Sequence, residues 1–519
     1  MKLNVKPNTI PLLLGITFLG LALLIEGFQI LKINQGHFVY TLDDAYIHLA
    51  LAENILQGHY GVNLAEFSAP SSSILWPFLL APFARVELAA LVLNILAAFA
   101  TVWVYTKILV QAFVIRLKGI QVFIITLILV LLILSTNLIG LVFSGMEHSL
   151  QVLVVAVIVW GLILVINENR LESWLLIAIG IAPMIRYENL AVSMAALLFL
   201  GLNKQYLKSL LVFTAIVVSL GLFSIFLLAN GQAIIPASVL AKSTLMNEGF
   251  IDSFLSNLFY NLQTWFGVVS IILIVFLAAL ILLAKMNLNR RRLALVTILG
   301  VVLHLIFGRT GWYRYEIYAL TFLSLSTIYL VGSLISPKLD QPRPLKSLAL
   351  FTTLVSISLV FSNLPYIMLL AYVPTSSNNV FSQHYQMHRF ATDYFQGPTA
   401  ANDIGYLTYK NDAYVLDLYG LASIEAYRFR MAGEPDNWMG TLCAEYDIEL
   451  VMIYEDWYPD IPDSWVKVGD LIYSGRKITI ANPTVAFFAT SAEAAETIQK
   501  DLQDFIPTLP ESSTFVFTP

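Results

Sequence analysis

Two adjacent carboxylates, Asp43 and Asp44, are the residues best suited to chemistry in this sequence of 519 residues. The segment that follows them has helical periodicity as far as Leu56 and stops before Gly58. In such a helix Asp44 and His48 lie on one face, four residues apart. One interpretation is that both acids only favour the positive end of the helix dipole.

The other interpretation is that one of these two acids is a general base, which takes a proton from the hydroxyl of an acceptor. Its neighbour would then orient the base, raise its pKa by repulsion, or hold a divalent cation. The residue types leave these three roles open. Nothing in the sequence has the spacing of a zinc site.

The composition places most of the chain in lipid. Hydrophobic residues make up 58% and charged residues 12%, with a mean hydropathy of +0.76, whereas soluble domains carry about 25% charged residues. This excludes a soluble enzyme, a disordered protein and a coiled coil. Residues 1–371 carry 21 Lys and Arg against 14 Asp and Glu, and residues 372–519 carry 8 against 20. We therefore predict a membrane part joined to an acidic soluble part, which argues against nucleic acid as a partner.

Apolar runs recur along residues 1–371 at the length that a membrane-spanning helix needs. No small-residue cleavage site follows the first run, so we expect an uncleaved anchor. We predict about eleven transmembrane helices, over residues 11–31, 87–113, 119–141, 146–166, 172–185, 188–203, 208–229, 255–285, 291–308, 315–334 and 347–371. The fifth and sixth are short, and we expect a hairpin with Arg186-Tyr187-Glu188 at its tip. Residues 71–82 are expected to be re-entrant or interfacial.

Lys and Arg are concentrated in one of the two sets of connecting loops, which predicts that this set is cytoplasmic. We thus expect an integral protein of the cell (inner) membrane with a cytoplasmic N-terminus. The membrane module would cover residues 1–371 with a first external loop over 32–86, and residues 372–519 would form an extracytoplasmic domain. Apolar runs at 413–418, 449–454 and 484–488, with helical periodicity over 492–505, predict an α/β fold for that domain.

Four more polar clusters fall on the predicted external side. They are Gly145–His148, Arg186–Glu188, Ile235–Lys242 and Gly308–Arg314. Ionisable residues near the membrane usually mark a site, although each one alone is also explained by snorkelling or by a local ion pair. The three cations of the last two clusters, Lys242, Arg309 and Arg314, would lie where a lipid phosphate sits.

Aromatic residues stand beside these cations. Trp312, Tyr313 and Tyr315 belong to the same short loop as Arg309 and Arg314. They are explained either as an aromatic belt at the membrane interface or as residues that stack on a sugar.

Taken in order along the chain, these motifs resemble those of the GT-C class of polytopic membrane glycosyltransferases. Within that class they look like the branch that contains the arabinofuranosyltransferases of the mycobacterial cell wall. Asp43–Ile47 matches Asp-Asp-Ala-(Tyr/Phe)-Ile, and Gly145–His148 matches Gly-(Leu/Met)-Glu-(Thr/His). Residues 186–188 match Arg-Pro-Glu except at Tyr187, and Pro236–Lys242 matches Pro-Asn-Thr-Tyr-Tyr-Ala-Lys loosely. The stretches Asp403–Leu407 and Leu416–Leu421 resemble the soluble tail of the class.

The resemblance implies a GT-C-like, all-α polytopic module and a hexosyl- or pentosyltransferase. It would move one sugar from a polyprenyl monophosphate to a hydroxyl of an extracytoplasmic glycan, lipid or protein. Asp43 is implied as the base, with Asp44 supporting it. The matches for donor-phosphate ligands are Arg186, Lys242, Arg309 and Arg314. Expected substrate contacts are Tyr46, His48, Glu147, His148, Glu188, Trp312, Tyr313 and Asp403. Members of the class differ in whether they need a metal, so a divalent cation stays open.

Two other classes of protein compete with this hypothesis. The first is a membrane transporter or lipid flippase with functional carboxylates on the external side, although no repeat of the kind common in transporters is visible. The second is a non-catalytic scaffold whose α/β domain binds a glycan or a partner protein, since the tail carries Tyr454, Trp457 and Tyr458. Neither explains the charged loops near the membrane as well as the enzyme does.

Overall fold

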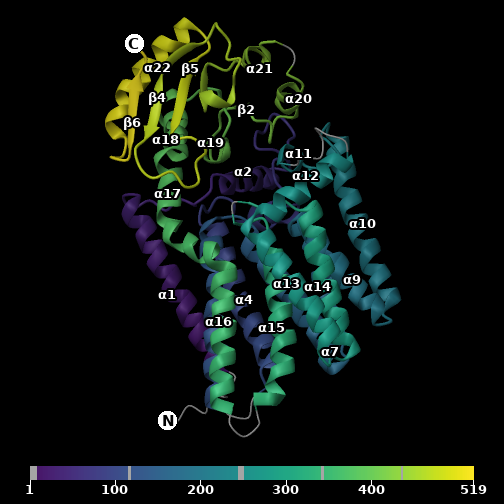
Figure 1. Cartoon of the computed structure of the whole chain (residues 1–519). Coiled ribbons are helices and arrows are strands. Elements are labelled where there is room, and N and C mark those ends of the chain that lie inside the picture. Colours follow the sequence, from purple (N-terminus) through teal and green to yellow (C-terminus); the bar gives the residue numbers. More distant parts are fainter. Residues whose placement is uncertain (1–8, 115–117, 243–249, 312, 340–343, 434–435) are drawn as a thin grey trace.

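A computed structural model describes residues 9–114, 118–242, 250–311, 313–339, 344–433 and 436–519. Long helices form one bundle, and a domain that contains a β-sheet caps one end of it (Figure 1). Among the residues described, seven helices are long and apolar enough to cross a membrane, and three shorter apolar helices accompany them. The predicted polytopic helical membrane protein with a C-terminal α/β domain is thereby confirmed, while the number eleven stays a prediction.

The bundle is built from the segments that hydropathy selects. Its first half contains α1 (Thr9–Ile33), α4 (Ala89–Ala112), α5 (Lys118–Ser135), α6 (Leu138–Phe143), α7 (His148–Glu168), α8 (Ser173–Ile185) and α9 (Leu190–Leu202). Its second half contains α10 (Tyr206–Ala229), α12 (Phe250–Gln263), α13 (Trp265–Leu283), α14 (Leu288–Phe307), α15 (Ile317–Leu339) and α16 (Pro344–Met368). Helices α4, α7 and α15 form the centre, where more than half of each apolar segment is buried by neighbouring helices.

Two predicted spans are interrupted in the structure. The segment 119–141 divides into α5 and α6 at Asn137, whose φ of 48° lies in the left-handed region. The segment 255–285 divides into α12 and α13, because the side chain of Thr264 caps α13 by accepting the N–H of Gly267. The amide of Asn261 in α12 donates to the carbonyls of Leu305 and Gly308. Helix α12 therefore positions the loop that follows α14.

At the end of the bundle that the C-terminal domain covers, the short helices match the predicted hairpin and the predicted short segment 71–82. A 3-10 turn, η2 (Tyr187–Asn189), joins α8 to α9 as a hairpin. The side chain of Asn189 donates to the carbonyl of Ala182 and so ties the turn to the end of α8. The segment 71–82 contains only α3 (Leu75–Leu80) and the start of η1 (Ala81–Phe83), so its helix is too short to cross a bilayer.

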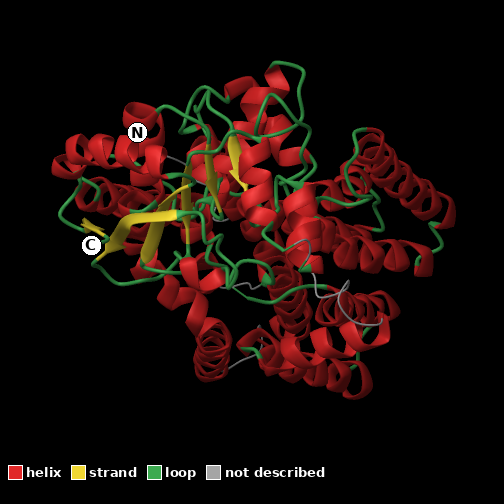
Figure 2. Cartoon of the chain, turned by 90° about the horizontal axis from the view of Figure 1, so that it is seen from above, coloured by secondary structure: helices red, strands yellow, loops and turns green. Residues whose placement is uncertain are grey.

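The C-terminal domain is built on one six-stranded sheet, seen from above in Figure 2. Its strands are β1 (Thr399–Ala401), β2 (Val415–Asp417), β3 (Leu450–Ile453), β4 (Val466–Tyr473), β5 (Thr484–Ala489) and β6 (Ser513–Phe517). They lie in the order β2-β1-β3-β5-β4-β6, and β2, β1 and β3 are parallel while the other pairs are antiparallel. The predicted strands coincide with β2, β3 and β5, and the predicted helix is α22 (Ala492–Phe505).

The domain is joined to the bundle by helix rather than by a linker. Helix α16 continues through η4 (Leu369–Tyr372) into α17 (Val373–Ser382) and α18 (His384–Arg389), as Figure 1 shows. The predicted boundary between residues 371 and 372 lies inside this helical run. The relative placement of bundle and domain is therefore set by the helical backbone at this point.

A second junction fixes the domain on the first loop. Helix α2 (Asp44–Leu56) packs against α19 (Gly405–Thr408), and the rings of Tyr46 and Tyr406 lie 3.8 Å apart between centroids. The hydroxyl of Tyr406 donates to Glu87 at 2.7 Å. Burial of these aromatic rings on both sides of the junction stabilises the docked arrangement.

The junction has no room for a side chain at Gly405. A methyl group there would run into the carbonyl oxygen and the carboxylate of Asp43, and overpacking of this kind costs about 1–3 kcal/mol. We expect Gly405→Ala to lower the Tm of the detergent-solubilised protein and to speed proteolysis of the C-terminal domain. Gly221→Ala in α10, where no atom lies within 4 Å, is the matched control and should leave both quantities unchanged. Equal proteolysis rates in the two variants would contradict this account of the junction.

Candidate active site

Asp43 is held by the C-terminal domain. It precedes α2 but makes no side-chain cap on that helix. Its two carboxylate oxygens instead accept the backbone N–H groups of Gly405, at 2.7 Å, and Tyr406, at 2.8 Å. A carboxylate has about four lone-pair positions, so these two bonds leave each oxygen able to accept a further proton or hydrogen bond.

The surroundings of Asp43 raise its pKa above the ordinary value of a carboxyl group. Burial raises the pKa of Asp43 to about 6, the positive charge of His384 lowers it, and the negative charge of Asp403 raises it. His384 lies 3.3 Å from the Asp403 carboxylate through its Nε2. The predicted contact residue Asp403 thus lies beside the predicted base, and a carboxylate with a pKa near 6 is well matched to general-base work near neutral pH.

Asp44 faces a cation on the bundle. Its carboxylate lies 2.9 Å from Nη2 of Arg314, which also donates to the hydroxyl of Tyr315 at 3.1 Å. The other two nitrogens of Arg314, Nε and Nη1, are buried and find no acceptor in the part of the chain that the structure describes. Arg314 therefore keeps hydrogen-bond donors for an anion.

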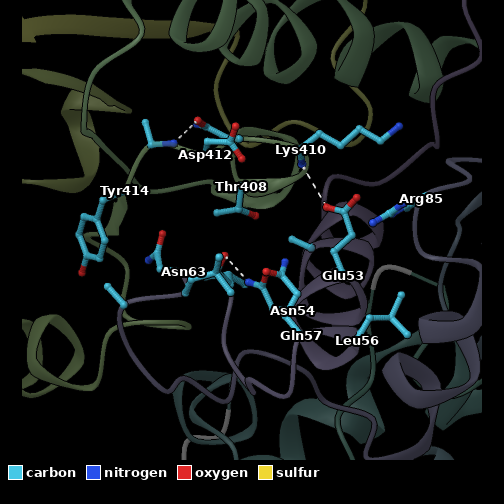
Figure 3. A pocket seen from close by; sticks show the side chains of 16 residues that line it. Glu53, Asn54, Leu56, Gln57, Asn63, Arg85, Thr408, Lys410, Asp412 and Tyr414 are labelled. Carbon is cyan, nitrogen blue, oxygen red and sulfur yellow. Dashed lines mark hydrogen bonds between the residues drawn. The ribbon is translucent and has the colours of Figure 1, made fainter.

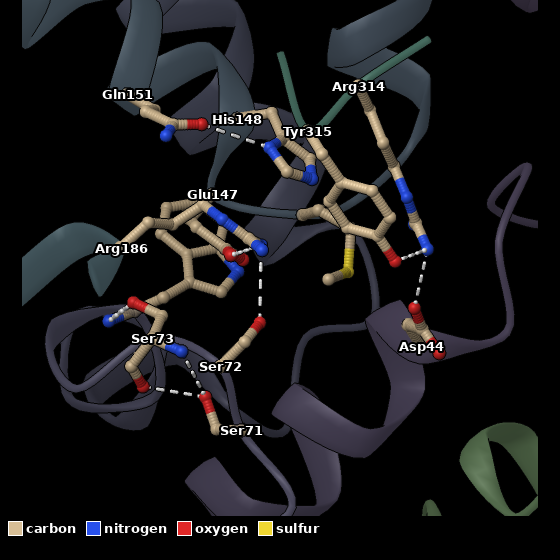
Figure 4. Close-up of polar contacts among 12 residues, drawn as sticks. Asp44, Ser71, Ser72, Ser73, Glu147, His148, Gln151, Arg186, Arg314 and Tyr315 are labelled. Atoms are coloured by element: carbon tan, nitrogen blue, oxygen red, sulfur yellow. Dashed lines mark hydrogen bonds and ion pairs between the residues drawn. The ribbon is translucent and has the colours of Figure 1, made fainter. Parts of the chain in front are cut away.

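Arg186 is at the centre of a buried charge network (Figure 4). Its guanidinium contacts Glu147 at 2.5 Å, Glu188 at 2.8 and 3.2 Å, and the hydroxyl of Ser72 at 3.2 Å. Glu147 is fully buried, and 3% of the Arg186 side chain is exposed. Because most of its donors are taken by protein groups, Arg186 is placed to position α7, α8 and α9. Its predicted contact with a donor phosphate stays a prediction.

The two predicted histidines belong to the same network. Nε2 of His48 lies 3.5 Å from Glu147, and its Nδ1 lies 3.1 Å from the hydroxyl of Ser71. His148 contacts Gln151 at 3.2 Å and packs edge-on against the ring of Tyr315. Both imidazoles are buried, so they contact other residues of the network and do not reach its surface.

Tyr315 connects the two arginines. The guanidinium carbons of Arg186 and Arg314 lie 5.4 and 5.0 Å from its ring centroid, within the range of cation–π attraction. The motif resemblance singles out no tyrosine at this position. The burial of Tyr315, at 5% exposure, depends on contacts with α7 and η2 that are remote in sequence.

The remaining predicted residues do not share one environment. Tyr46 is buried in the junction, and its hydroxyl lies 3.3 Å from Glu87, so it does not face a substrate surface. Tyr313 is 41% exposed and packs against Tyr366, away from the two arginines. Lys242 ends α11 (Ala237–Lys242), and its side chain lies outside what the structure describes. Trp312 also lies outside the described residues.

A cavity of about 660 Å³ opens beside this network. Its polar lining includes Ser72, Arg186, Glu188, Ser238, Arg309 and Tyr315. Its apolar lining comes from α9 and α14 and includes Leu190, Ala191, Met194, Leu303 and Phe307. The cavity can therefore hold a molecule that is polar at one end and apolar along its length.

A second cavity, of about 740 Å³, lies between the C-terminal half of α2 and the C-terminal domain (Figure 3). Its lining is polar and carries both signs of charge, with Glu53 and Asp412 opposed by Arg85 and Lys410. None of the residues predicted for the site lines it. Asp43 and Asp44 lie instead at the N-terminal end of α2, where Arg314 contacts Asp44.

Within the described residues, no group of three or more His, Cys, Asp or Glu side chains is arranged to hold a metal ion. Asp44 faces an arginine, and both oxygens of Asp43 accept backbone N–H groups. The predicted divalent cation stays a prediction.

The buried position of Arg186 predicts a large effect on stability. Removal of one partner from a buried ion pair costs about 3–5 kcal/mol, and Arg186→Met leaves both Glu147 and Glu188 without their cation. We expect a marked fall in the Tm of the purified protein in detergent. Arg170→Met is the matched control, since 64% of that side chain is exposed beside Glu168 and Glu172 and surface pairs contribute about 0–1 kcal/mol. Equal Tm values for the two variants would contradict the structural role of Arg186.

Comparison with protein families gives one match, to a domain of unknown function, DUF8728, over residues 378–488. This region lies in the C-terminal domain and includes His384, Asp403 and Gly405. No curated protein matches the chain.

Several solved structures are similar to the chain at low identity. The arabinofuranosyltransferase AftD from Mycobacteria is 14% identical over 92% of this chain and 42% of its own, with a TM-score of 0.46. ArnT from Cupriavidus metallidurans bound to undecaprenyl phosphate is 11% identical over 92% and 98%, with a TM-score of 0.47. The Archaeoglobus fulgidus oligosaccharyltransferase is 11% identical over 93% and 77%, with a TM-score of 0.44. The chain thus spans less than half the length of AftD, and an arabinofuranosyltransferase, the group that the sequence motifs resemble, is among these similar structures.

Proposed function

We propose that the chain is an integral-membrane glycosyltransferase. It transfers one sugar from a polyprenyl monophosphate to a hydroxyl of a glycan, lipid or protein outside the cytoplasm. The observation that carries the proposal is the pairing of a tuned carboxylate with a cation at one end of the bundle. Asp43 provides the base. Arg314, which is paired with the adjacent Asp44, provides two buried nitrogens that find no acceptor among the described residues.

The donor lipid is assigned to the cavity between α9 and α14. Arg309 lines its polar part, and Tyr315 connects that part to Arg314. A phosphate placed there meets guanidinium groups, which bind phosphate oxygens through paired hydrogen bonds. The apolar walls from Leu190, Met194 and Phe307 then contact the polyprenyl chain. An amphipathic cavity of this kind suits a lipid phosphate better than a nucleotide sugar.

The reaction follows from this placement. The acceptor hydroxyl gives its proton to the carboxylate of Asp43, and its oxygen forms a bond to the anomeric carbon of the donor sugar. The bond from that carbon to the phosphate oxygen breaks, and its electron pair stays with the leaving polyprenyl phosphate. The negative charge that develops on the phosphate is stabilised by Arg314 and Arg309, a favourable arrangement in a site of low dielectric.

The excess of Lys and Arg in one set of loops supports an orientation with the C-terminal domain outside. The hydrogen bond from Arg292 to Asn203 and the one from Tyr329 to Asn167 lie at the end opposite the site. That end carries the basic loops. We therefore place the site and the C-terminal domain on the extracytoplasmic face of the cell (inner) membrane.

Replacement of the base tests the proposal directly. We expect Asp43→Asn to reduce the release of polyprenyl phosphate by about 10²–10⁴-fold, the contribution that a general base makes. The measurement is mass spectrometry of the purified protein with a panel of polyprenyl-phosphate sugars and a glycan acceptor. Release by the wild-type protein also identifies the sugar that is transferred.

Asp504→Asn is the matched control, because Asp504 is an exposed carboxylate of α22 far along the chain from the site. It should release polyprenyl phosphate at the wild-type rate. Equal release by Asp43→Asn and the wild-type protein would remove Asp43 from the role of base. Protein-dependent flux of the lipid across liposomes without sugar transfer would instead support a transporter.

The pKa of Asp43 sets a pH dependence. The base works when it is ionised, so kcat/KM should rise with pH and level off above about 6. The cation at His384 lowers the pKa of Asp43. We therefore expect His384→Asn to move the acid limb of the profile to higher pH. His59→Asn is the control, since His59 contacts the carbonyl of Glu66 and is not among the groups that shift Asp43. An unchanged limb in His384→Asn would exclude this coupling.

A further inference from the structure

The three parallel strands of the C-terminal domain end at the same edge of the sheet. The residues that directly follow them are Asn402 and Asp403 after β1, Leu418 and Tyr419 after β2, and Tyr454 after β3. The carboxyl ends of parallel strands are the common place for ligands in α/β domains. This edge therefore brings together chemically useful side chains from three separate parts of the sequence.

Three aromatic rings meet at this edge, which we call the aromatic edge and define as Tyr419, Tyr454 and Trp457. Tyr454 is buried, and Tyr419 is partly buried. Trp457 is 40% exposed. Its ring lies 5.6 Å from that of Tyr419 and 5.1 Å from that of Tyr454. Large aromatic side chains that stay partly exposed on a folded surface are typical of recognition sites.

Polar groups at the aromatic edge lack partners. The guanidinium of Arg430 stacks on the ring of Tyr419 at 4.1 Å, and its Nε is buried without an acceptor in the described residues. The hydroxyl of Tyr458, a residue 5% exposed, is also buried and finds no partner there. Buried polar atoms are normally hydrogen-bonded, so these two atoms point to a ligand that supplies hydroxyl groups.

The charge of the aromatic edge selects a neutral ligand. Asp403 is one-third exposed, and the carboxylates of Glu455 and Asp456 lie on the exposed turn next to Trp457. Arg430 adds a cation on Tyr419, and Lys467 pairs with Glu455 at 2.7 Å, so the surface carries both signs of charge and favours neither an anion nor a cation. Carboxylates and stacked rings together match a sugar, whose hydroxyls donate to acids and whose C–H face packs on an aromatic ring.

A short series of contacts and neighbouring residues links the aromatic edge to Asp43, the proposed base. The hydroxyl of Tyr454 donates to Gln383 at 2.6 Å, and the next residue, His384, lies 3.3 Å from Asp403. Two residues after Asp403, the N–H of Gly405 binds Asp43. A saccharide held on Trp457 and Asp403 therefore lies on the same side of the domain as Asp43.

We infer that the aromatic edge binds the acceptor, and that the acceptor is a neutral saccharide. This inference rests on the proposed function and narrows its acceptor class from glycan, lipid or protein to a carbohydrate. It also assigns a ligand to the matched domain of unknown function, because Asp403, Tyr419, Arg430 and Trp457 all lie within residues 378–488. Trp457 and Tyr419 provide stacking, and Asp403 orients a sugar hydroxyl towards the base.

Direct binding tests the inference without any need for catalysis. The full-length protein in detergent is titrated with neutral gluco-, manno-, galacto- and arabino-oligosaccharides, and binding is followed by saturation-transfer NMR. We expect at least one series to bind, Trp457→Ala to weaken its Kd by about tenfold or more, and Trp457→Phe to retain most of the affinity. Phe517→Ala, which removes another exposed aromatic side chain of the same domain, is the matched control and should bind like the wild-type protein. Absence of binding in every series, or equal Kd values for Trp457→Ala and the wild type, would overturn the inference.

Kinetics separate this inference from the proposed function. With an oligosaccharide that binds, Trp457→Ala should raise the KM for the acceptor and leave kcat and the KM for the donor close to wild type. Transfer by Trp457→Ala with an unchanged acceptor KM would overturn the aromatic edge and leave the glycosyltransferase intact. Saccharide binding that depends on Trp457 in a protein without transfer activity would overturn the glycosyltransferase and support the binding surface alone.

Discussion

One buried guanidinium determines how the capped end of the bundle is arranged. Arg186 lies between the carboxylates of Glu147 and Glu188, and its positive charge offsets the desolvation cost of burying these two acids. These residues begin or end three helices, so the contact fixes α7, α8 and α9 relative to one another. The hydroxyl of Ser72 attaches the segment 71–82 to the same group. With Arg186 occupied, Arg314 is the buried arginine of this network that keeps two nitrogens without an acceptor among the described residues.

The C-terminal domain contributes groups that hold Asp43 in place. Asp43 belongs to the first loop, yet the N–H groups that orient its carboxylate come from Gly405 and Tyr406. The raised pKa of Asp43 reflects burial beneath that domain, moderated by the charge of His384. A carboxylate in open water would have its ordinary pKa of about 4 and no fixed orientation. The domain thus supplies both the geometry and the basicity of this acid.

The sequence predicts helices better than it predicts the contacts between them. Long apolar runs need no partner to be recognised, and α22 is found at its observed bounds because its apolar face repeats with helical period. The break at Thr264 depends on one side-chain cap within an apolar run, and β1 has only three residues, so neither gives a periodic signal. Motif order indicates Asp43 and Glu147, and the cations clustered on the predicted external side indicate Arg314. The ion pair of Arg314 with Asp44 joins residues 270 positions apart and becomes visible only in the folded chain.

The segment from Asp403 to Gly405 lies between the aromatic edge and Asp43. At one end, Asp403 faces His384 and the aromatic edge, and at the other end, Gly405 binds the base. A ligand that moves the backbone at Asp403 would therefore also move the N–H group that orients Asp43. Gly405 packs directly on Asp43 with no space for a side chain, so such a movement would be transmitted to Asp43. The acceptor surface and the base that we propose are thus only three residues apart along the chain, which gives a reason for packing the C-terminal domain directly onto the first loop.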